Sequence, residues 1–481
     1  MKERTVGLTK RLIQITSKLR FKDLPEEDVD KTKLVLLDSI GCALAGQVVD
    51  RGRMIMDLAK ELGGNAQATI IGHHRTSYNL AAFANGELIN ALEYDSIGPL
   101  SAHVCPYVIP PCLAMAERVH ASGKDLMIAL ALALEIGGRV TNSFALQRIP
   151  KDGPPYYENV QRFTYANAVF GGVLGACKLL RLDVDKTLNA FGIAGASTPV
   201  PAVMKWAETD GPAIMVKYNA WTGWVAQLGT VAALLAEKGF TGDKTILDGE
   251  WGFWKIVGSP FFNVDNLLGG LGKAWHIKEV TFKPYPVCGL NHCGIEGISK
   301  IVQEHPMKPE EIEKIVIKGD PLLQTPNRRG TKIESFADMQ FSNAYIFALA
   351  CYYGSRPSPA WLMPSVYNDP RIKALSKKVR IELHPRIEEL MRSKIKAGKV
   401  PLFMDTIVEI TVRGGRKFTV EITAPKGSPT NPVTEIELVE KFRTNASYSM
   451  LPNRRVGKII EMIKGLEEVD DITNLMKLLV V

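Results

Sequence analysis

The stretch Leu126–Gly138, LMIALALALEIGG, has a single charged residue, Glu135. A helix that is apolar around its whole circumference normally lies at the centre of a protein, because no face of it suits water. The uncharged run Leu126–Leu134 is much shorter than the roughly twenty residues that cross a bilayer. It therefore predicts the central helix of a helical core and not a membrane span.

Working outward from this stretch, the neighbouring segments repeat the helical spacing and end at glycines. Residues 26–45 begin with acids, which interact favourably with the positive end of a helix dipole. They are followed by Gly46, a residue that commonly ends a helix. The segment AVFGGVLGACKLL, residues 168–180, contains three glycines, which indicate close helix packing and not a phosphate loop. Further helices are expected at 51–62, 76–92, 105–121, 124–146, 163–180, 183–197 and 212–238.

Beyond about residue 270 the pattern alternates as strands do. Strands are expected at 313–319 and 377–385, with a hairpin over 406–423 that turns at Gly414–Gly415. Helices are expected at 292–304 and 340–353, and again from 454 to 479. We predict a mainly α protein, in which a large all-helical domain is interrupted by a smaller α+β lid domain. The helical domain takes residues 1–268, the lid takes 269–432, and helices within 433–481 return to the first domain.

The composition narrows the classes of protein that need to be considered. The chain has 481 residues, with 59 basic against 51 acidic side chains and no long basic run. This weak positive balance argues against nucleic acid as a partner and favours a small anionic substrate. Seven scattered cysteines without a Cys-x-x-Cys pair, and a charged N-terminus unlike a signal peptide, predict a soluble cytoplasmic protein with reduced thiols, no membrane partner and no metal.

Ionisable residues gather in LEYDSIGPLSAH, residues 92–103, between two apolar segments. Glu93 and Asp95 follow the first segment, His103 precedes the second, and Gly98–Pro99 breaks the helix between them. Acids at a helix C-terminus oppose the dipole, so they do not stabilise that end. The stretch is either an exposed polar loop or part of an active site.

Two other segments carry candidate chemistry. In KPYPVCGLNHCGIEG, residues 283–297, two prolines fix an extended backbone before His292, where a new helix begins and its amides could meet an anion. The alternative is a rigid turn between a strand and a helix. In MVKYNAWTGW, residues 215–224, Lys217 is either a buried charge that needs a partner or a surface lysine with a buried stem.

Several motifs, in order along nearly the whole chain, resemble the MmgE/PrpD family. They are FANGELINALEYD (83–95) before His103, GACKLLRLD (175–183), KPYP (283–286) before His292, QFS (340–342) and PKGSPTNP (425–432) before Lys441–Phe442. The family includes 2-methylcitrate dehydratases, cis-aconitate decarboxylases and iminodisuccinate epimerases. The resemblance implies a helical domain with an α+β lid, a homodimer, a site between the domains, and no metal or organic cofactor.

The resemblance also assigns residues. Glu93 and Asp95 match acidic positions of the family motif, His103 and His292 match its histidines, and Lys283 and Lys217 match its lysines. The chain departs from the family at Ser96, Ile97 and Val104, and Arg162 stands in place of a second histidine. The implied catalytic residues are His103, His292, Lys217 and Glu93, and the implied substrate-binding residues are Arg162, Lys283, Asp95 and Ser342.

The implied reaction is removal of a proton next to a carboxylate by a cofactor-independent lyase, with loss of water from a di- or tricarboxylate. Either His103 or His292 can be the base, while Lys217, Arg162 and Lys283 hold carboxylates. Glu93 would orient His103 or donate a proton to the leaving hydroxyl. Three alternatives stay open: an isomerase like iminodisuccinate epimerase, a cis-aconitate decarboxylase-like enzyme, and a non-catalytic binding protein that keeps the family fold.

Overall fold

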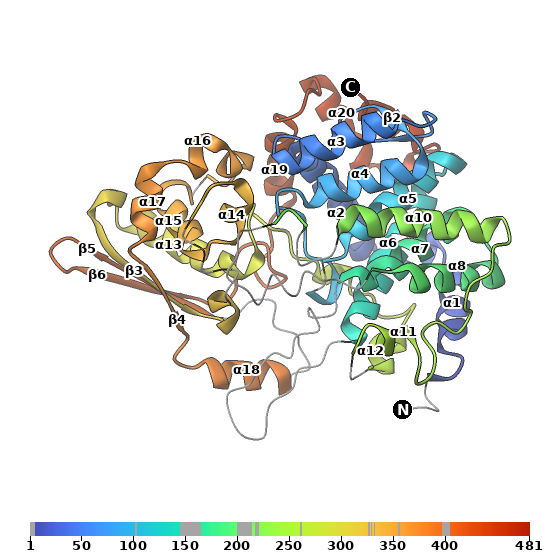
Figure 1. The fold of residues 1–481 in the computed structure, drawn as a ribbon, viewed down its shortest axis with the longest axis horizontal. Coiled ribbons are helices and arrows are strands. Elements are labelled where there is room, and N and C mark those ends of the chain that lie inside the picture. Colours follow the sequence, from blue (N-terminus) through green and yellow to red (C-terminus); the bar gives the residue numbers. More distant parts are fainter. Residues whose placement is uncertain are drawn as a thin grey trace.

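The computed structural model describes residues 5–101, 103–144, 165–199, 214–216, 221–259, 262–325, 328, 330, 332–354, 356–396 and 405–481. Figure 1 shows a large helical lobe beside a smaller lobe that holds the main β-sheet. The two lobes have separate hydrophobic cores. The predicted mainly α class is confirmed, while the proposed domain boundaries and the role of the smaller lobe as a lid stay predictions.

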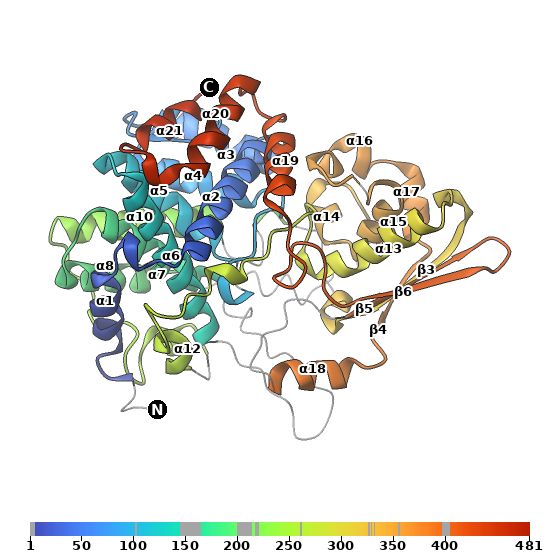
Figure 2. The ribbon, with the colours of Figure 1, turned by 180° about the vertical axis from the view of Figure 1, so that it is seen from behind.

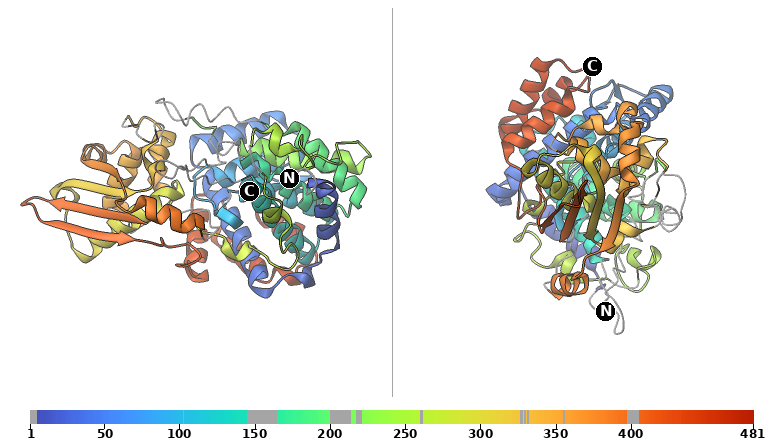
Figure 3. Two further views of the ribbon diagram at one scale, coloured as in Figure 1. Left: turned by 90° about the horizontal axis from the view of Figure 1, so that it is seen from below. Right: turned by 90° about the vertical axis from the view of Figure 1, so that its left-hand side faces the viewer.

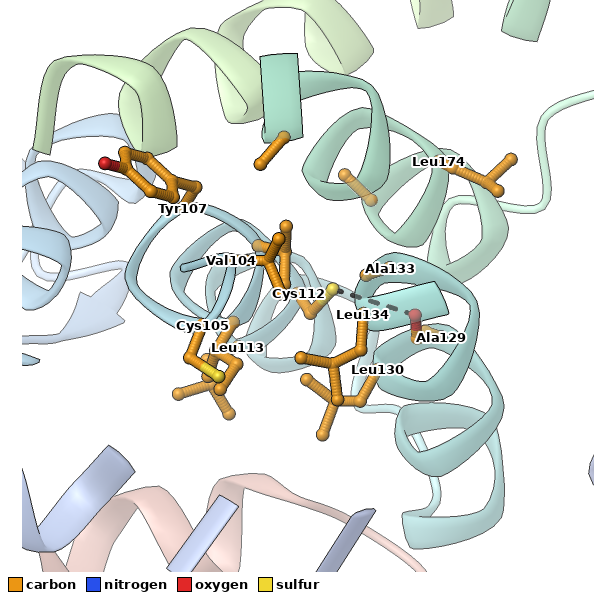
Figure 4. Close-up of a cluster of buried hydrophobic side chains, with 14 of the residues drawn as sticks. Val104, Cys105, Tyr107, Cys112, Leu113, Ala129, Leu130, Ala133, Leu134 and Leu174 are labelled. Carbon is orange, nitrogen blue, oxygen red and sulfur yellow. Dashed lines mark hydrogen bonds between the residues drawn. The ribbon is translucent and has the colours of Figure 1, made fainter. Parts of the chain in front are cut away.

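Helix α6 (Gly123–Ser143), which contains the opening stretch, lies in the core of the helical lobe as expected. It packs against α5 (Cys105–Val119) and α7 (Val169–Leu179), and these contact α4 (Tyr78–Asn90) and α10 (Thr222–Glu237). Figure 4 shows Leu130, Ala133 and Leu134 of α6 facing Cys112 and Leu113 of α5. α6 has the length and composition of a membrane span, but 89% of its most apolar window is buried inside the protein.

The glycines of α7 permit this close packing, as the sequence predicts. A Cβ at Gly171 would meet the carbonyl oxygen of Ala133 on α6, and one at Gly175 would meet Cys112 Sγ on α5. Both would come closer than the 3.0 Å that real Cβ atoms keep. The backbones of α5, α6 and α7 can therefore approach only because these positions have no side chain.

The outer helices complete the helical lobe, and the C-terminal ones return to it. α19 (Glu435–Ala446) packs along α2 (Glu26–Gly46), and α20 (Asn453–Lys464) and α21 (Thr473–Leu478) follow it, as Figure 2 shows. Among the described residues, this lobe also contains the α-helices α1 (Leu8–Lys18), α3 (Asp50–Leu62), α8 (Val184–Ser197), α11 (Phe253–Ile256) and α12 (Val264–Leu268). A short ribbon joins β1 (Ala68–Thr69) to β2 (Arg75–Thr76).

The smaller lobe is built on a four-stranded sheet of order β4-β3-β5-β6. β3 (Ile312–Gly319) pairs in parallel with β4 (Val379–Leu383) and antiparallel with β5 (Thr406–Val412), which forms a hairpin with β6 (Lys417–Ile422). Gly414 and Gly415 turn the hairpin with φ of 86° and 79°. Figure 3 shows this hairpin at the far end of the molecule from the helical lobe. The helices of the lobe are α13 (His292–Glu304), α14 (Phe336–Phe341), α15 (Asn343–Tyr353), α16 (Pro364–Tyr367), α17 (Pro370–Ser376) and α18 (Ile387–Lys396).

Two differences from the expected elements affect the site. α4 ends at Asn90, so Glu93 and Asp95 lie beyond the helix and not in its last turn. The helix expected at 340–353 breaks at Ser342, whose hydroxyl accepts a hydrogen bond from Tyr345 N at 3.4 Å and begins α15. A side-chain cap of this kind competes with a continuous helix, which the apolar spacing did not reveal.

The segment after α4 lies where the two lobes meet. Ala91, Leu92 and Tyr94 belong to the hydrophobic core of the smaller lobe, although the helix before them belongs to the helical lobe. Ile97 and Thr281 exchange two backbone hydrogen bonds, of 2.8 and 2.9 Å. This bridge places residues 93–97 beside residues 281–283, which lead into the smaller lobe.

Candidate active site

The acidic stretch after α4 is buried. Glu93, Asp95 and Ser96 are 0% exposed, and His103 is 4% exposed. Glu93 also has a φ of 52°, a left-handed conformation that non-glycine residues seldom adopt. The interpretation as an exposed polar loop is therefore wrong, because buried carboxylates in an unusual backbone conformation require specific partners.

Lys283 is the partner of Glu93. Its Nζ lies 3.3 Å from Glu93 Oε2, and both side chains are 0% exposed. The same ammonium group donates a hydrogen bond of 3.4 Å to the carbonyl oxygen of Val287. Lys283 is fully buried because its KPYP segment runs between the lobes. Its charge is therefore placed in the interior beside a carboxylate, where an anionic substrate would also be attracted.

Asp95 and His103 form the second pair. Asp95 Oδ2 lies 3.9 Å from His103 Nδ1, and Asp95 Oδ1 accepts a hydrogen bond of 3.0 Å from Asn90 Nδ2. Burial alone would raise the pKa of Asp95, but the interaction with His103 and the positive charge of Lys283 outweigh it, so this pKa lies below its ordinary value. Asp95 is thus a carboxylate beside an imidazole, the arrangement that orients a histidine for proton transfer.

His292 provides a different imidazole. It is 0% exposed and meets the ring of Tyr285 edge-on, with ring centroids 5.2 Å apart. Burial and the nearby positive charges of Lys283 and then Lys441 lower the pKa of His292 to about 3. His292 is therefore neutral at physiological pH, and the charge of Lys283 acts on both His292 and Asp95.

Asn90, which donates to Asp95, belongs to a larger buried polar network. Arg51 Nη1 donates to Asn90 Oδ1 at 3.3 Å, and Arg51 Nε donates to Glu87 Oε2 at 2.8 Å. Glu87 Oε1 accepts from the hydroxyl of Thr222 and from the amide of Gly223, at the start of α10. This network was missed from the sequence. Polar residues within the apolar run FANGELINALEYD were the signal that could have revealed Glu87 and Asn90.

Three predicted site residues remain: Ser342, Lys217 and Arg162. Ser342 is buried, and its hydroxyl caps α15; Gln340 Nε2, two residues earlier, donates to the carbonyl oxygen of Ala91 at 3.2 Å. Lys217 and Arg162 lie outside the described residues, so their roles stay predictions. All seven cysteines are buried free thiols, and the described part of the chain contains no group of three or more potential metal ligands.

The cluster combines an ionised carboxylate beside one histidine with a neutral histidine and a buried lysine. Such a set of residues is typical of an active site that transfers protons to or from an anionic substrate. The comparison with known families agrees with this class. Residues 10–262 match the MmgE/PrpD N-terminal domain and residues 285–468 match the MmgE/PrpD C-terminal domain. The chain belongs to the MmgE/PrpD family.

Curated relatives match almost the full length of the chain. The chain is 27% identical to a cis-aconitate decarboxylase of Mus musculus over 96% of this chain and 91% of the relative. It is 26% identical to the Homo sapiens enzyme of the same name, over 96% and 92% of the two chains. It is 25% identical to a cis-aconitate decarboxylase of Aspergillus terreus, over 98% and 96%. These relatives support a lyase-like enzyme.

Proposed function

We propose that this protein is a lyase that acts on a small di- or tricarboxylate through a carbanion next to a carboxylate, with loss of water as in 2-methylcitrate dehydratases. The observation that carries the proposal is the buried set of His103 with Asp95 and Lys283 with Glu93, near a neutral His292. The chain's own residues supply both a base and positive charge for carboxylate oxygens, so the reaction proposed here needs no cofactor.

In this mechanism His103 takes the proton from the carbon next to the substrate carboxylate. Asp95, ionised and 3.9 Å away, stabilises the positive imidazole that forms. Lys283 binds the carboxylate on which negative charge develops. When the substrate carboxylate binds Lys283, the ammonium compensates the buried charge of Glu93 less, so Glu93 takes up a proton from solvent and passes it to the leaving hydroxyl. The C–H electron pair becomes the C=C bond, and water leaves.

Loss of carbon dioxide is the second candidate, and the names of the curated relatives favour it. A carboxylate leaves as CO2, the electron pair stays on the adjacent carbon, and the protonated His103 supplies the proton that quenches it. Ile97 and Val104 are 1% and 0% exposed and cannot hydrogen-bond a substrate through their side chains. The family resemblance implies a threonine at the position of Ile97, so the loss of this hydroxyl allows a substrate that differs from that of the relatives.

The test is to supply citrate, 2-methylcitrate and cis-aconitate in deuterated water. We expect an ultraviolet-absorbing unsaturated product from one of the first two, or CO2 from cis-aconitate together with a decarboxylated product that carries deuterium at the carbon that His103 protonates. His103→Ala and His292→Ala should each abolish turnover and leave the circular dichroism spectrum unchanged. Binding of these acids without turnover or exchange would overturn the enzyme proposal in favour of a binding protein.

We also propose a cytoplasmic homodimer with the smaller lobe acting as a lid over the site. The proposal rests on the family resemblance and on the seven buried thiols, which suit a reducing compartment. Light scattering on the purified chain should give about twice the monomer mass of 53.0 kDa.

A further inference from the structure

Lys441 of α19 reaches from the C-terminal region of the chain into the junction that holds the site. Its side chain is 9% exposed, and no role is given to it by the mechanism above. We propose that Lys441 is a positioning residue that holds the segment of Glu93 and Asp95 in register with the segment of Lys283. The proposal rests on the proposed function for its catalytic consequence, and on the contacts alone for its structural part.

The Lys441 ammonium makes three close polar contacts. Nζ lies 2.8 Å from the carbonyl oxygen of Tyr94 and 2.9 Å from that of Lys283. It also lies 2.7 Å from Asp38 Oδ1 of α2. The two carbonyl contacts are hydrogen bonds, and the contact with Asp38 is an ion pair. One side chain thus ties together α19, α2 and the backbone of both site segments.

Both backbone contacts are made beside site residues. Tyr94 stands between Glu93 and Asp95, and Lys283 is itself the partner of Glu93. A shift of either carbonyl would change the 3.3 Å separation between Lys283 Nζ and Glu93 Oε2. Because productive proton transfer depends on fractions of an ångström, a clamp on these two carbonyls acts on the reaction without touching the substrate.

Further contacts hold the Lys441 ammonium in place. It lies 3.8 Å from the centroid of the Tyr94 ring, a cation–π contact, and the Tyr94 hydroxyl donates to the carbonyl oxygen of Pro284 at 3.1 Å. Asp38 is 2% exposed; burial raises its pKa, and the charge of Lys441 opposes that rise. Phe442, the next residue, packs against Gly41 of α2, which fixes α19 on the lobe.

Lys441 also contributes charge to the site. Its positive charge is one of the causes that lower the pKa of His292, together with burial and Lys283. The titratable groups that its charge acts on are Asp38 and Cys42 of α2 and His292 at the start of α13, and Lys283 acts on His292 with the same sign. Removing Lys441 would therefore make protonation of nearby bases easier, which loss of packing alone would not do.

The experiment compares Lys441→Met, which keeps the stem and removes the charge, with Lys441→Arg, which keeps the charge. Arg443→Met on the same helix is the control, because Arg443 is about half exposed. We expect Lys441→Met to lower kcat/KM by at least 100-fold and to move the acidic limb of its pH profile to higher pH. Lys441→Arg should leave that limb in place, and Arg443→Met should match the wild type.

Hydrogen–deuterium exchange measured by mass spectrometry tests the clamp without any substrate. In Lys441→Met, amides of residues 93–97 and 281–287 should exchange faster, while α6 and the sheet keep the wild-type rates. If Lys441→Met does not fold, Lys441→Gln is measured in the same way. If amides of residues 93–97 and 281–287 in Lys441→Met exchange at the wild-type rates, the positioning role is overturned. If Lys441→Met has the wild-type kcat/KM and the acidic limb of its pH profile does not move, the catalytic consequence of that role is overturned. An inactive wild type with the expected exchange change would instead count against the proposed function alone.

Discussion

The pKa of Asp95 is lowered although the residue is fully buried, and in the proposed mechanism its charge stabilises the protonated form of His103. Asp95→Asn keeps the shape and the contact with Asn90 Nδ2 but removes the charge that stabilises a protonated imidazole. We expect kcat to fall by about 10²- to 10⁴-fold, in line with the loss of a carboxylate that supports a histidine base. Steady-state kinetics on the active substrate measure this, with the exposed Asp57→Asn as control. Equal kcat in Asp95→Asn and the wild type would show that His103 works without Asp95.

His292 gives the protein a pH-dependent stability. Its pKa of about 3 in the folded chain lies below the ordinary 6.5, so between these pH values the unfolded chain binds more protons than the folded one. The free energy of unfolding therefore decreases as pH falls below about 6.5. Urea unfolding at pH 7 and pH 5 should show a larger loss for the wild type than for His292→Gln. Identical losses in the two proteins would mean that His292 is not held neutral.

At the scale of elements, the close packing of α7 depends on its glycines, although glycine is intrinsically a weak helix former. Gly171→Ala would press a Cβ against the carbonyl oxygen of Ala133, whereas Gly457→Ala on α20 meets nothing within 4 Å. We expect the first change to lower the free energy of unfolding by about 1–3 kcal/mol and the second to raise it by about 0.5–1 kcal/mol. Thermal and urea unfolding of both variants check this, and a stable Gly171→Ala would mean that α6 and α7 can separate freely.

The sequence predicted a helix or strand well where neighbouring residues encode that element. The helix over 292–304 and the hairpin at Gly414–Gly415 match the structure, because apolar spacing and turn residues are properties of neighbouring positions. The break at Ser342 and α18 (Ile387–Lys396) were missed. A serine cap and a short helix with few apolar residues leave little signal in the spacing.

In the site, too, some residues could be predicted from local motifs, whereas others depend on contacts between distant parts of the chain. The family resemblance predicted Glu93, Asp95, His103, Lys283 and His292 as site residues, and these residues lie at or beside the junction of the lobes. Their supports, Arg51 and Lys441, were not predicted as such. Arg51 is 39 residues from Asn90, and Lys441 is 347 residues from Tyr94, so only the folded chain brings these partners together.

For the whole molecule, the junction between the lobes is held by buried charges as well as by apolar contacts. Glu93 comes from the helical lobe, while Lys283 opens the segment that leads to α13. A buried ion pair adds little net stability by itself. Removing one partner is costly, however, because the other charge then stays buried without that compensation. The two residues should therefore be strongly coupled in their effect on folding.

A double-mutant cycle measures that coupling. Lys283→Met alone and Glu93→Gln alone should each lower the free energy of unfolding by about 3–5 kcal/mol, because each leaves a buried charge without its main partner. Glu93→Gln with Lys283→Met should cost clearly less than the sum, since both charges are gone. The exposed pair Lys464–Glu435 is the control, with coupling below about 1 kcal/mol. Additive losses at Glu93 and Lys283 would contradict the buried pair, and would mean that water reaches the junction and solvates each charge separately.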